Sequence, residues 1–374
     1  MKLLAVRLHR VRLPLVSPFT TSFSTQFERL ALLVEVDADV GGTRVTGWGE
    51  NVAMADPLYS PEYVDGCAEV IRRWLGPALF PVDDLTAETV GHHLRHVVGH
   101  PMAKACLEMA VLDVQLRARE QSFASYLGGV RSSVASGVSV GIHETVDALL
   151  ASVSGYLDEG YARIKVKIRP GWDIGPIRAI RREFGSDLPL QADANAAYTL
   201  ADTQLLRQLD EFELLLLEQP LAEDDLRQHA LLAERLRTPI CLDESIVSAR
   251  SAADAIALAA TQVINVKPGR VGGYLEAVRV HDIARANGIP VWCGGMLETG
   301  LGRSANAALA SLPGFTLPGD ISASSRFYRE DLTEPIEMHD GLVEVSKRPG
   351  VGLSPLPGRL AKYSEGMVEV DARA

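Results

Sequence analysis

The feature of this sequence that most restricts its fold is a regular spacing of charged residues at the ends of short apolar runs. Lys167, Asp193, Glu218, Asp243 and Lys267 follow one another at intervals of 24 to 26 residues. A helix-like segment separates each apolar run from the next. Alternation of strand and helix at this interval is typical of βα units that build a parallel sheet.

The strand pattern predicts a closed barrel. Strand-like runs occupy residues 134–142, 162–168, 188–195, 214–220, 239–245, 263–269, 290–296 and 315–320. Eight βα units suit a parallel (β/α) barrel, in which the carboxyl ends of the strands carry the catalytic residues. An open, doubly wound sheet is the alternative, but it requires a glycine-rich phosphate loop, and the sequence has no GxGxxG motif after an early strand.

The rest of the chain follows a different pattern. Residues 1–130 combine long strand-like runs with three helix-like segments, which predicts a separate α+β domain, termed the capping domain. Residues 131–322 form the predicted barrel. Residues 323–374 contain several prolines and are too short for a domain, so we expect them to pack back on the capping domain.

Composition and charge disfavour several classes of protein. The 374 residues carry 37 Lys and Arg against 48 Asp and Glu, a net charge of −11, which argues against nucleic acid or an anionic membrane as partner. No apolar run has the length of a transmembrane helix, and Arg7, His9 and Arg10 interrupt the region that is apolar in a signal peptide. The four cysteines form no CxxC motif. We therefore expect a cytoplasmic protein that acts on a small molecule.

Three of the regularly spaced residues are carboxylates on consecutive predicted strands. Asp193, Glu218 and Asp243 would converge at one rim of the barrel, where their mutual repulsion requires a cation. Oxygen ligands that leave room for a substrate suit a hard divalent ion, and Mg²⁺ is the most natural choice. Alternatively, each acid caps the helix that follows it, an arrangement that is common for one residue but much less so for three in register.

Lysines accompany these carboxylates. Lys165 and Lys167 are two residues apart on one predicted strand, so their side chains point to the same side. Two ammonium groups in a dry interior repel each other, and we expect the pKa of at least one to fall until the amine can act as a base. Lys267 arrives from across the barrel mouth. Two amines and a metal ion suit removal of a proton next to a carboxylate, followed by racemisation or elimination. Alternatively, the lysine side chains lie on the protein surface and have no catalytic role.

The segments KVK, DAN, EQP, DES, VKPG and CGGMLETGLGR strongly resemble the enolase superfamily, specifically its muconate lactonising subgroup. Within this subgroup the chain is most similar to N-acylamino acid (N-succinylamino acid) racemases that also act as o-succinylbenzoate synthases. The resemblance implies Mg²⁺-dependent removal of an α-proton from a carboxylate substrate through an enediolate, with Mn²⁺ or Co²⁺ as substitutes. It also implies a link to menaquinone biosynthesis and a homo-oligomer, with an octamer as one option.

The resemblance implies a role for each of the charged residues. Lys167 and Lys267 would be the two acid–base groups. Lys165 would assist the substrate carboxylate, and Glu244 would orient Lys267. The metal ligands would be the three carboxylates at the strand ends: Asp193, Glu218 and Asp243.

The resemblance also implies which residues contact the substrate. They lie on two capping-domain loops, at barrel strand ends and beside the metal ligands: Phe23, Met54, Tyr59, Ser139, Asn195, Gly294, Gly295, Met296 and Leu297. Dipeptide epimerases of this superfamily carry an Asp-x-Asp near strand eight, whereas this chain has Asp320-Ile321-Ser322. This departure disfavours a substrate with a free amine and suits an acylated nitrogen.

Other functions stay open at this point. A muconate-type cycloisomerase would use the same metal ion and lysines beneath a different lid. An o-succinylbenzoate synthase without racemase activity would need a single working base. A Schiff-base lyase would use Lys167 without a metal ion, and a barrel without catalytic activity would bind its ligand without turnover.

Overall fold

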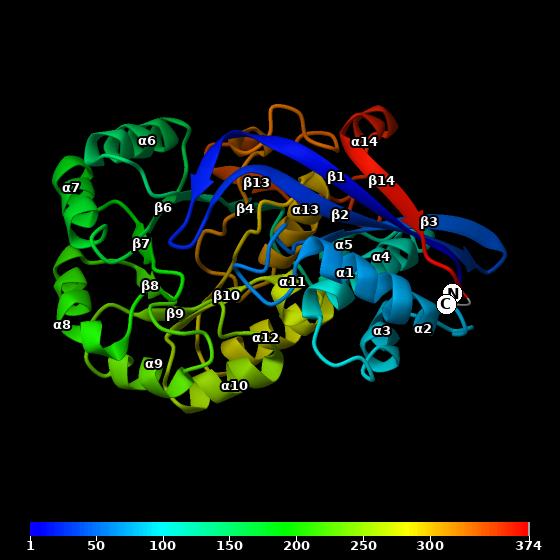
Figure 1. Ribbon diagram of the computed structural model, residues 1–374, viewed down its shortest axis with the longest axis horizontal. Helices are drawn as coiled ribbons and strands as arrows, with labels where there is room; N and C mark the ends of the chain where they lie inside the picture. Colours follow the sequence, from blue (N-terminus) through cyan, green and yellow to red (C-terminus); the bar gives the residue numbers. More distant parts are fainter. Residues whose placement is uncertain (373–374) are drawn as a thin grey trace.

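The structure is a computed structural model that describes residues 1–372. Figure 1 shows a barrel of strands and helices on one side and an antiparallel sheet with its own helices on the other. Near the two ends of the described chain, Arg7 and Glu369 are paired on neighbouring antiparallel strands of this sheet. No helix within the described residues is both long and apolar enough to cross a membrane.

Seven parallel strands form the barrel sheet, and their order in space follows their order in the chain. They are β5 (Gly137–Val140), β6 (Arg163–Lys167), β7 (Leu190–Asp193), β8 (Leu216–Glu218), β9 (Ile240–Leu242), β10 (Val263–Val266) and β11 (Val291–Cys293). Every residue of β6 to β11 is buried. Burial of both faces explains why these runs are continuous and apolar rather than alternating.

The predicted barrel with a capping domain is confirmed. The prediction of a regular eighth strand is wrong. Within residues 315–320, Phe315 forms a single parallel bridge to β11, and Gly319 forms another to the residue that precedes β5. The segment therefore links the two edges of the sheet without being a regular strand. Pro318 lies between the two bridges and has no N–H to donate, which prevents a continuous ladder.

The first predicted barrel strand, residues 134–142, is also divided. Its first part is β4 (Ser133–Ala135), which pairs antiparallel with β13 (Leu342–Glu344). A short strand, β12 (Met338–His339), completes this small sheet. Only β5 enters the barrel, so the C-terminal part of the chain covers the bottom of the first strand.

Helices surround the barrel strands. They are α6 (Val146–Asp158), α7 (Ile174–Phe184), α8 (Thr203–Leu206) with the 3-10 turns η2 (Leu200–Asp202) and η3 (Arg207–Phe212), α9 (Leu226–Ala233), α10 (Ala249–Ala257), α11 (Pro268–Val271), α12 (Tyr274–Ala286) and α13 (Gly300–Ala310). In α7 the Asp173 side chain accepts a hydrogen bond from the Ile174 N–H, and Ile174, Ile177 and Ile180 form the buried stripe. The spacing of these isoleucines buries one helical face against the sheet.

The capping domain is built on a four-stranded antiparallel sheet in the order β14-β1-β2-β3. Its strands are β1 (Lys2–Thr20), β2 (Thr25–Val40), β3 (Thr43–Asn51) and the C-terminal β14 (Ser364–Glu369), which follows α14 (Pro357–Tyr363). Its helices are α1 (Val64–Val70), the π-turn η1 (Ile71–Leu75), α2 (Gly76–Leu79), α3 (Ala87–His93), α4 (Pro101–Ala118) and α5 (Phe123–Leu127). The Cβ of any residue replacing Gly49 would lie 2.0 Å from the Cys106 carbonyl oxygen, so glycine lets β3 pack directly on α4.

The hairpin of β1 and β2 extends beyond the capping sheet and reaches the mouth of the barrel (Figure 1). At its tip, the Thr20 carbonyl accepts a hydrogen bond from the N–H of Ile142. The hydroxyl of Ser22 lies 3.5 Å from the carbonyl oxygen of Asn195. The tip is thereby fixed over the carboxyl ends of the barrel strands.

A buried acid also joins the two parts of the chain. Glu50, on β3, accepts hydrogen bonds at 2.9 Å from the N–H groups of Thr299 and Gly302, and at 2.7 Å from the Thr299 hydroxyl. These donors belong to the N-terminal turn of α13, where a helix has free N–H groups. Burial raises the pKa of Glu50 to about 7 in spite of these hydrogen bonds.

This raised pKa predicts that stability falls as the pH rises. In the unfolded chain Glu50 loses its proton near the ordinary value of 4.5, whereas the folded protein keeps it up to about pH 7. Between these values unfolding releases a proton, so the free energy of unfolding decreases, by on the order of 3 kcal/mol for this group. Urea denaturation at about pH 5 and about pH 8 measures the effect. Glu50→Gln should make the decrease smaller.

Glu88 provides the control for this experiment. Its hydrogen bonds to Tyr126 and Gln115 outweigh burial and lower its pKa to about 2, so its titration lies outside this pH interval. Glu88→Gln should leave the change in stability between about pH 5 and about pH 8 as it is. Equal pH dependence in wild type and Glu50→Gln would contradict the role assigned to Glu50.

Candidate active site

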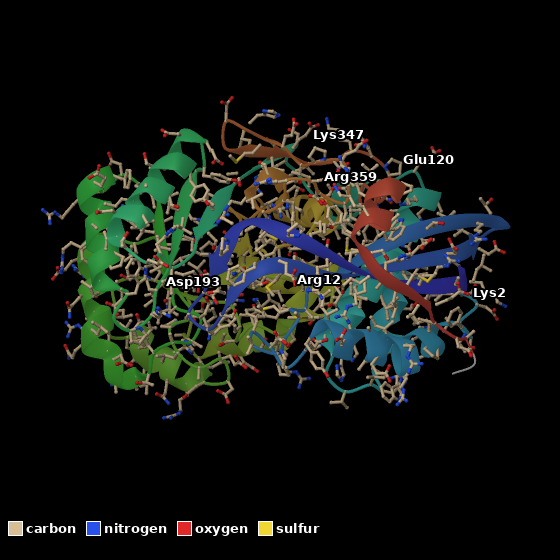
Figure 2. All side chains as sticks on the ribbon, turned by 45° about the horizontal axis from the view of Figure 1, so that its top comes forward. Lys2, Arg12, Glu120, Asp193, Lys347 and Arg359 are labelled. Carbon is tan, nitrogen blue, oxygen red and sulfur yellow. The ribbon has the colours of Figure 1, made fainter. Side chains whose placement is uncertain are left out.

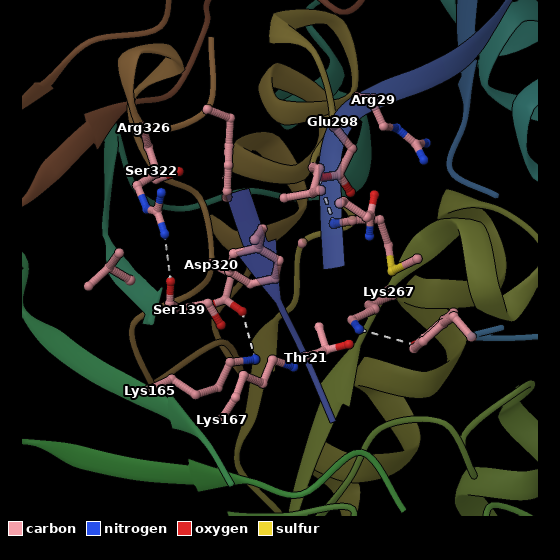
Figure 3. Close-up of a pocket in the computed structure, with 18 of the residues that line it drawn as sticks. Thr21, Arg29, Ser139, Lys165, Lys167, Lys267, Glu298, Asp320, Ser322 and Arg326 are labelled. Carbon is pink, nitrogen blue, oxygen red and sulfur yellow. Dashed lines mark hydrogen bonds and ion pairs between the residues drawn. The ribbon is translucent and has the colours of Figure 1, made fainter. Parts of the chain in front are cut away.

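A cavity lies at the carboxyl ends of the barrel strands, where the tip of the β1–β2 hairpin meets the barrel (Figure 3). Most of the residues singled out from the sequence line it: Phe23, Met54, Tyr59, Ser139, Lys165, Lys167, Asn195, Lys267, Gly295, Met296 and Leu297. Residues from both parts of the chain therefore share one cavity, although they are far apart in the sequence.

Five of the singled-out residues lie outside this lining: Asp193, Glu218, Asp243, Glu244 and Gly294. The three predicted metal ligands are buried at the strand ends, and Figure 2 shows Asp193 inside the barrel while Lys2, Glu120 and Lys347 lie at the periphery. Gly294 is packed against Lys267, because a Cβ there would lie 2.7 Å from the Lys267 Cε. Its expected contact with the substrate stays a prediction.

The three carboxylates come from neighbouring strands, as their spacing predicts. Asp193 and Glu218 are paired in register as the last residues of β7 and β8, and Asp243 follows the last residue of β9. Burial and the repulsion from Asp193 raise the pKa of Glu218. Burial would raise the pKa of Asp193 as well, but Lys167 and Lys165 outweigh it and lower that pKa.

Lys165 connects three acids. Its Nζ lies 2.8 Å from Asp320, 3.0 Å from Glu218 and 3.2 Å from Asp193. Burial lowers the pKa of this ammonium, but the three acids raise it more, so the pKa lies above its usual value. The expectation that repulsion between lysines lowers a pKa is wrong for Lys165, because the acids around it outnumber the neighbouring lysines.

Lys167 is the last residue of β6, and two hydrogen bonds hold its ammonium group. Its Nζ donates hydrogen bonds to Asp193 at 2.6 Å and to the Asn195 Oδ1 at 2.7 Å. The Nδ2 of Asn195 in turn donates to Glu244 at 2.8 Å. Glu244 was expected to orient Lys267, but its hydrogen bond goes to Asn195, so its direct contact is with the residue that holds Lys167. Burial raises the pKa of Glu244 to about 7.

Lys267 enters the cavity from the other side, as Figure 3 shows. Its Nζ lies 2.8 Å from Asp243 and 3.1 Å from the hydroxyl of Tyr59, whose ring centroid is 4.7 Å away. Burial lowers its pKa, but Tyr59, Glu244 and Glu218 raise it above the usual value. Tyr59 belongs to the second capping loop, and that loop therefore contacts a barrel lysine directly.

The backbone is strained at three residues close to the lysines and carboxylates of the site. Asn195, Gln219 and Leu297 have φ values of 42°, 36° and 58°, in the left-handed region that such residues rarely adopt. Gln219 shows what holds this conformation. Its side chain accepts from the N–H of Asp243 at 3.0 Å and donates to the Ser245 hydroxyl at 2.8 Å. This single glutamine thereby fixes the turn that carries Asp243.

Comparisons with known proteins agree with this arrangement. Residues 148–358 match the model described as enolase C-terminal domain-like, and residues 4–128 match the N-terminal domain of mandelate racemase and muconate lactonizing enzyme. Together the two models span most of the chain. The chain belongs to the enolase superfamily.

Two similar relatives differ in the activity that their names give. An N-succinylamino acid racemase from an Amycolatopsis species is 60% identical over 98% of this chain and 99% of the relative. An o-succinylbenzoate synthase from Geobacillus kaustophilus is 45% identical over 96% of this chain and 95% of the relative. The crystal structure of an enolase superfamily member from Listeria innocua is 36% identical and superposes with a TM-score of 0.94 over 100% of both chains.

Membership of the enolase superfamily implies a divalent metal ion. The chemistry of this site fits one, because three buried carboxylates from neighbouring strands offer only oxygen donors. In the described part of the chain no three acidic, histidine or cysteine side chains are gathered as ready-made metal ligands. The acids instead face lysines and Arg270.

The sequence analysis did not predict that several charged residues, among them Arg163 and Arg270, contribute to the site. Arg163 donates to Asp320 at 2.9 Å, and Lys165 contacts the same acid at 2.8 Å, so together they outweigh burial and lower the pKa of Asp320 to about 2. The two-residue period of the strand places Arg163 on the same side as Lys165 and Lys167, a signal that was available. Arg270 pairs with Asp243 and donates to two backbone carbonyls, which no local pattern indicated.

Gly294 provides a test of this geometry. Gly294→Ala would place a Cβ 2.2 Å from the Asn265 Oδ1 and 2.7 Å from the Lys267 Cε, so both side chains must move. We expect a loss of kcat of about 10-fold or more, since a small displacement of a catalytic group is costly. Steady-state kinetics and a thermal melt separate lost activity from lost folding.

A second glycine serves as the control. Gly155 lies on the exposed side of α6, and a Cβ there would meet nothing within 4 Å. Gly155→Ala should keep full activity and raise stability slightly, because alanine favours a helix. Full activity in Gly294→Ala would show that the position of Lys267 does not depend on this contact.

Proposed function

We propose that this enzyme racemises N-succinylamino acids and also forms o-succinylbenzoate by dehydration of a cyclohexadiene carboxylate, with Mg²⁺ in the site. The observation that carries the proposal is that Lys167 and Lys267 line one cavity from β6 and β10. These strands occupy the second and sixth of the barrel positions, so the two amines face each other across the mouth. Racemisation needs this arrangement, because a proton must leave one face of the carbon and return to the other.

Each lysine has a defined part in this chemistry. One amine takes the α-proton of the substrate, and the ammonium of the other gives a proton to the opposite face of the resulting enediolate. In the dehydration one amine removes the α-proton, and the ammonium so formed gives this proton to the neighbouring hydroxyl group, which leaves as water. Both reactions share the first step, so one pair of lysines supports both activities.

Asp193, Glu218 and Asp243 would hold the metal ion. When bound, the ion supplies the positive charge that stabilises the enediolate. These acids also raise the pKa of Lys165 and, in part, of Lys267. A carboxylate that serves as a metal ligand attracts a nearby ammonium less strongly, which favours the free amine needed for proton removal.

Capping-domain residues supply the other wall of the cavity. Phe23 and Met54 line it beside the barrel residues Ser139 and Met296, and we propose that they contact the acyl part of the substrate and exclude water. The remaining predicted contacts are assigned in the same way: Tyr59, Asn195, Gly295 and Leu297. Gly294 is left out of this set because it packs on Lys267.

The relatives support an acylated amino acid more than a lactone. The racemase from Amycolatopsis is 60% identical, whereas the muconate lactonizing enzyme from Pseudomonas fluorescens is 25% identical with a TM-score of 0.91 over 97% of this chain and 99% of that chain. The N-succinylamino acid racemase from Thermus thermophilus is 45% identical over 94% of this chain and 95% of the relative. We also propose a homo-oligomer in the cytoplasm, which light scattering and cell fractionation would test.

The first experiment follows the α-proton of N-succinyl-L-phenylalanine in D₂O by proton NMR, with chiral analysis of the product. We expect deuterium at the α-carbon together with racemisation, loss of both with EDTA, and recovery with Mg²⁺, because the carboxylate cluster needs the ion to stabilise the enediolate. Exchange without racemisation would point to one working base. Exchange that resists EDTA, or turnover of muconate alone, would contradict the proposal.

Variants of the two lysines test the assignment of the bases. Lys167→Ala and Lys267→Ala should each lower racemisation by about 10²- to 10⁴-fold, since each removes one of two acid–base groups. With the enantiomers examined separately, each variant should still exchange the α-proton of at most one, and the two variants should differ in which. Wild-type racemisation in either variant would rule out the two-base mechanism.

A further inference from the structure

Arg326 is a charged residue of the cavity that the proposed chemistry leaves without a role. It ends the 3-10 turn η4 (Ser324–Arg326), lines the cavity and is 9% exposed. The only hydrogen bond of its guanidinium to another described residue runs from Nη2 to the carbonyl oxygen of Ser139, at 3.0 Å (Figure 3). Its Nε is buried and has no acceptor.

The positive charge of Arg326 is not balanced by a nearby acid. Among residues 1–372 no carboxylate lies within ion-pair distance of its guanidinium, whereas Arg163 pairs with Asp320 and Arg270 pairs with Asp243. The one further acid in the lining, Glu298, already accepts hydrogen bonds from Met296 and Asn306. A buried cation with free donors is costly unless something negative binds to it.

Aromatic rings hold Arg326 in place. Its Cζ lies 4.8 Å from the ring centroids of Tyr156 and Phe327, and 5.9 Å from that of Phe19. These rings come from α6, from the residue after η4 and from the capping hairpin, so three segments fix one guanidinium. Rings cover the faces of the planar group and leave its N–H donors, which lie in the plane, for another partner.

Two other arginines of the cavity differ from Arg326 in the number of terminal nitrogens that donate hydrogen bonds to the protein. Arg303 donates to the carbonyls of Ser322 and Glu298, and Arg29 donates to those of Ala53 and Asn51. Both of their terminal nitrogens are therefore used to hold loops. Arg326 uses one, which leaves its second terminal nitrogen without a protein acceptor, whereas a buried Nε without an acceptor is common to all three arginines.

Arg326 also lies on a definite side of the reacting centre. Ser139, which it contacts, is on β5 and is paired in register with Lys165 on β6. Adjacent strands are about 4.8 Å apart, so the guanidinium lies just beyond the lysine pair of β6 and away from Lys267 on β10. A substrate whose α-carbon lies between Lys167 and Lys267 reaches Arg326 by extending its acyl group past Ser139.

We propose that Arg326 binds a second carboxylate of the substrate, at the far end of the acyl group. The proposal rests on the function proposed above and adds the group that selects an acyl chain ending in a carboxylate over a neutral one. A planar guanidinium suits a carboxylate, because the free Nη1 and the second N–H of Nη2 can donate two parallel hydrogen bonds to its two oxygens. The o-succinyl chain of the second reaction carries the same terminal group and meets the same residue.

The test compares two substrates that differ only in this group. N-succinyl-L-phenylalanine ends in a carboxylate, and N-succinamoyl-L-phenylalanine, its terminal amide, has nearly the same shape without the charge. Wild type should prefer the carboxylate in kcat/KM. Arg326→Gln should lower kcat/KM for the carboxylate by about 10- to 100-fold and that for the amide by less than about 3-fold, so the preference disappears. Arg326→Lys should keep part of it.

Arg131 provides the matched control for replacing an arginine that is part-buried and bonded to the backbone. It donates to the carbonyls of Leu312 and Pro313, outside the cavity. Arg131→Gln should leave the preference for the carboxylate unchanged even where it lowers stability. A thermal melt of each variant separates unfolding from a change in selectivity.

The outcomes distinguish this inference from the proposed function. Equal losses for the two substrates in a folded Arg326→Gln would give Arg326 a structural role and overturn the inference, as would a wild type that does not distinguish them. In either case racemisation would continue to support the proposed function. A wild type that racemises neither substrate would contradict the function itself.

Discussion

The interaction on which the rest of this structure depends is the pairing of buried charges at the carboxyl ends of the barrel strands. Each strand end delivers an acid or a base into a space with little water, where an unpaired charge is costly. Lys165 contacts Asp193, Glu218 and Asp320, while Lys267 and Arg270 share Asp243. Most of these charges therefore have more than one partner of opposite charge, which offsets the cost of burying them.

The barrel positions these charges, and the capping domain completes their surroundings. The register of β6 to β8 places Lys167, Asp193 and Glu218 side by side. The hairpin and the second capping loop then close the mouth, and Tyr59 reaches Lys267 from a part of the chain about two hundred residues earlier in the sequence. Glu50 fixes the capping sheet to α13, which follows the loop of Met296 and Leu297. The lining of the cavity is therefore a property of the interface between the two parts.

Much of this arrangement follows from periodicity. A near-constant interval between charged strand ends requires them to lie on one rim, because each βα unit returns the chain to the same end of the sheet. Periodicity also predicts that Lys165 and Lys167 face the same way. It does not predict pKa values, since these depend on every neighbour within a few ångströms. Lys165 and Lys167 were expected to repel each other and lower the pKa of at least one, but acids of three other segments raise the pKa of Lys165.

The sequence by itself determined the fold class, the common rim and the two lysines and three carboxylates that meet there. These follow from local strand and helix patterns and from a repeat that the chain carries along its whole barrel. Only the tertiary structure decided that Glu244 holds Asn195, that residues 315–320 close the barrel without a regular strand, and that Gly294 packs on Lys267. Only the tertiary structure shows that no carboxylate among residues 1–372 pairs with the guanidinium of Arg326. The physical reason is that charge balance and close packing are sums over neighbours from distant segments, and no local pattern records which neighbours those are.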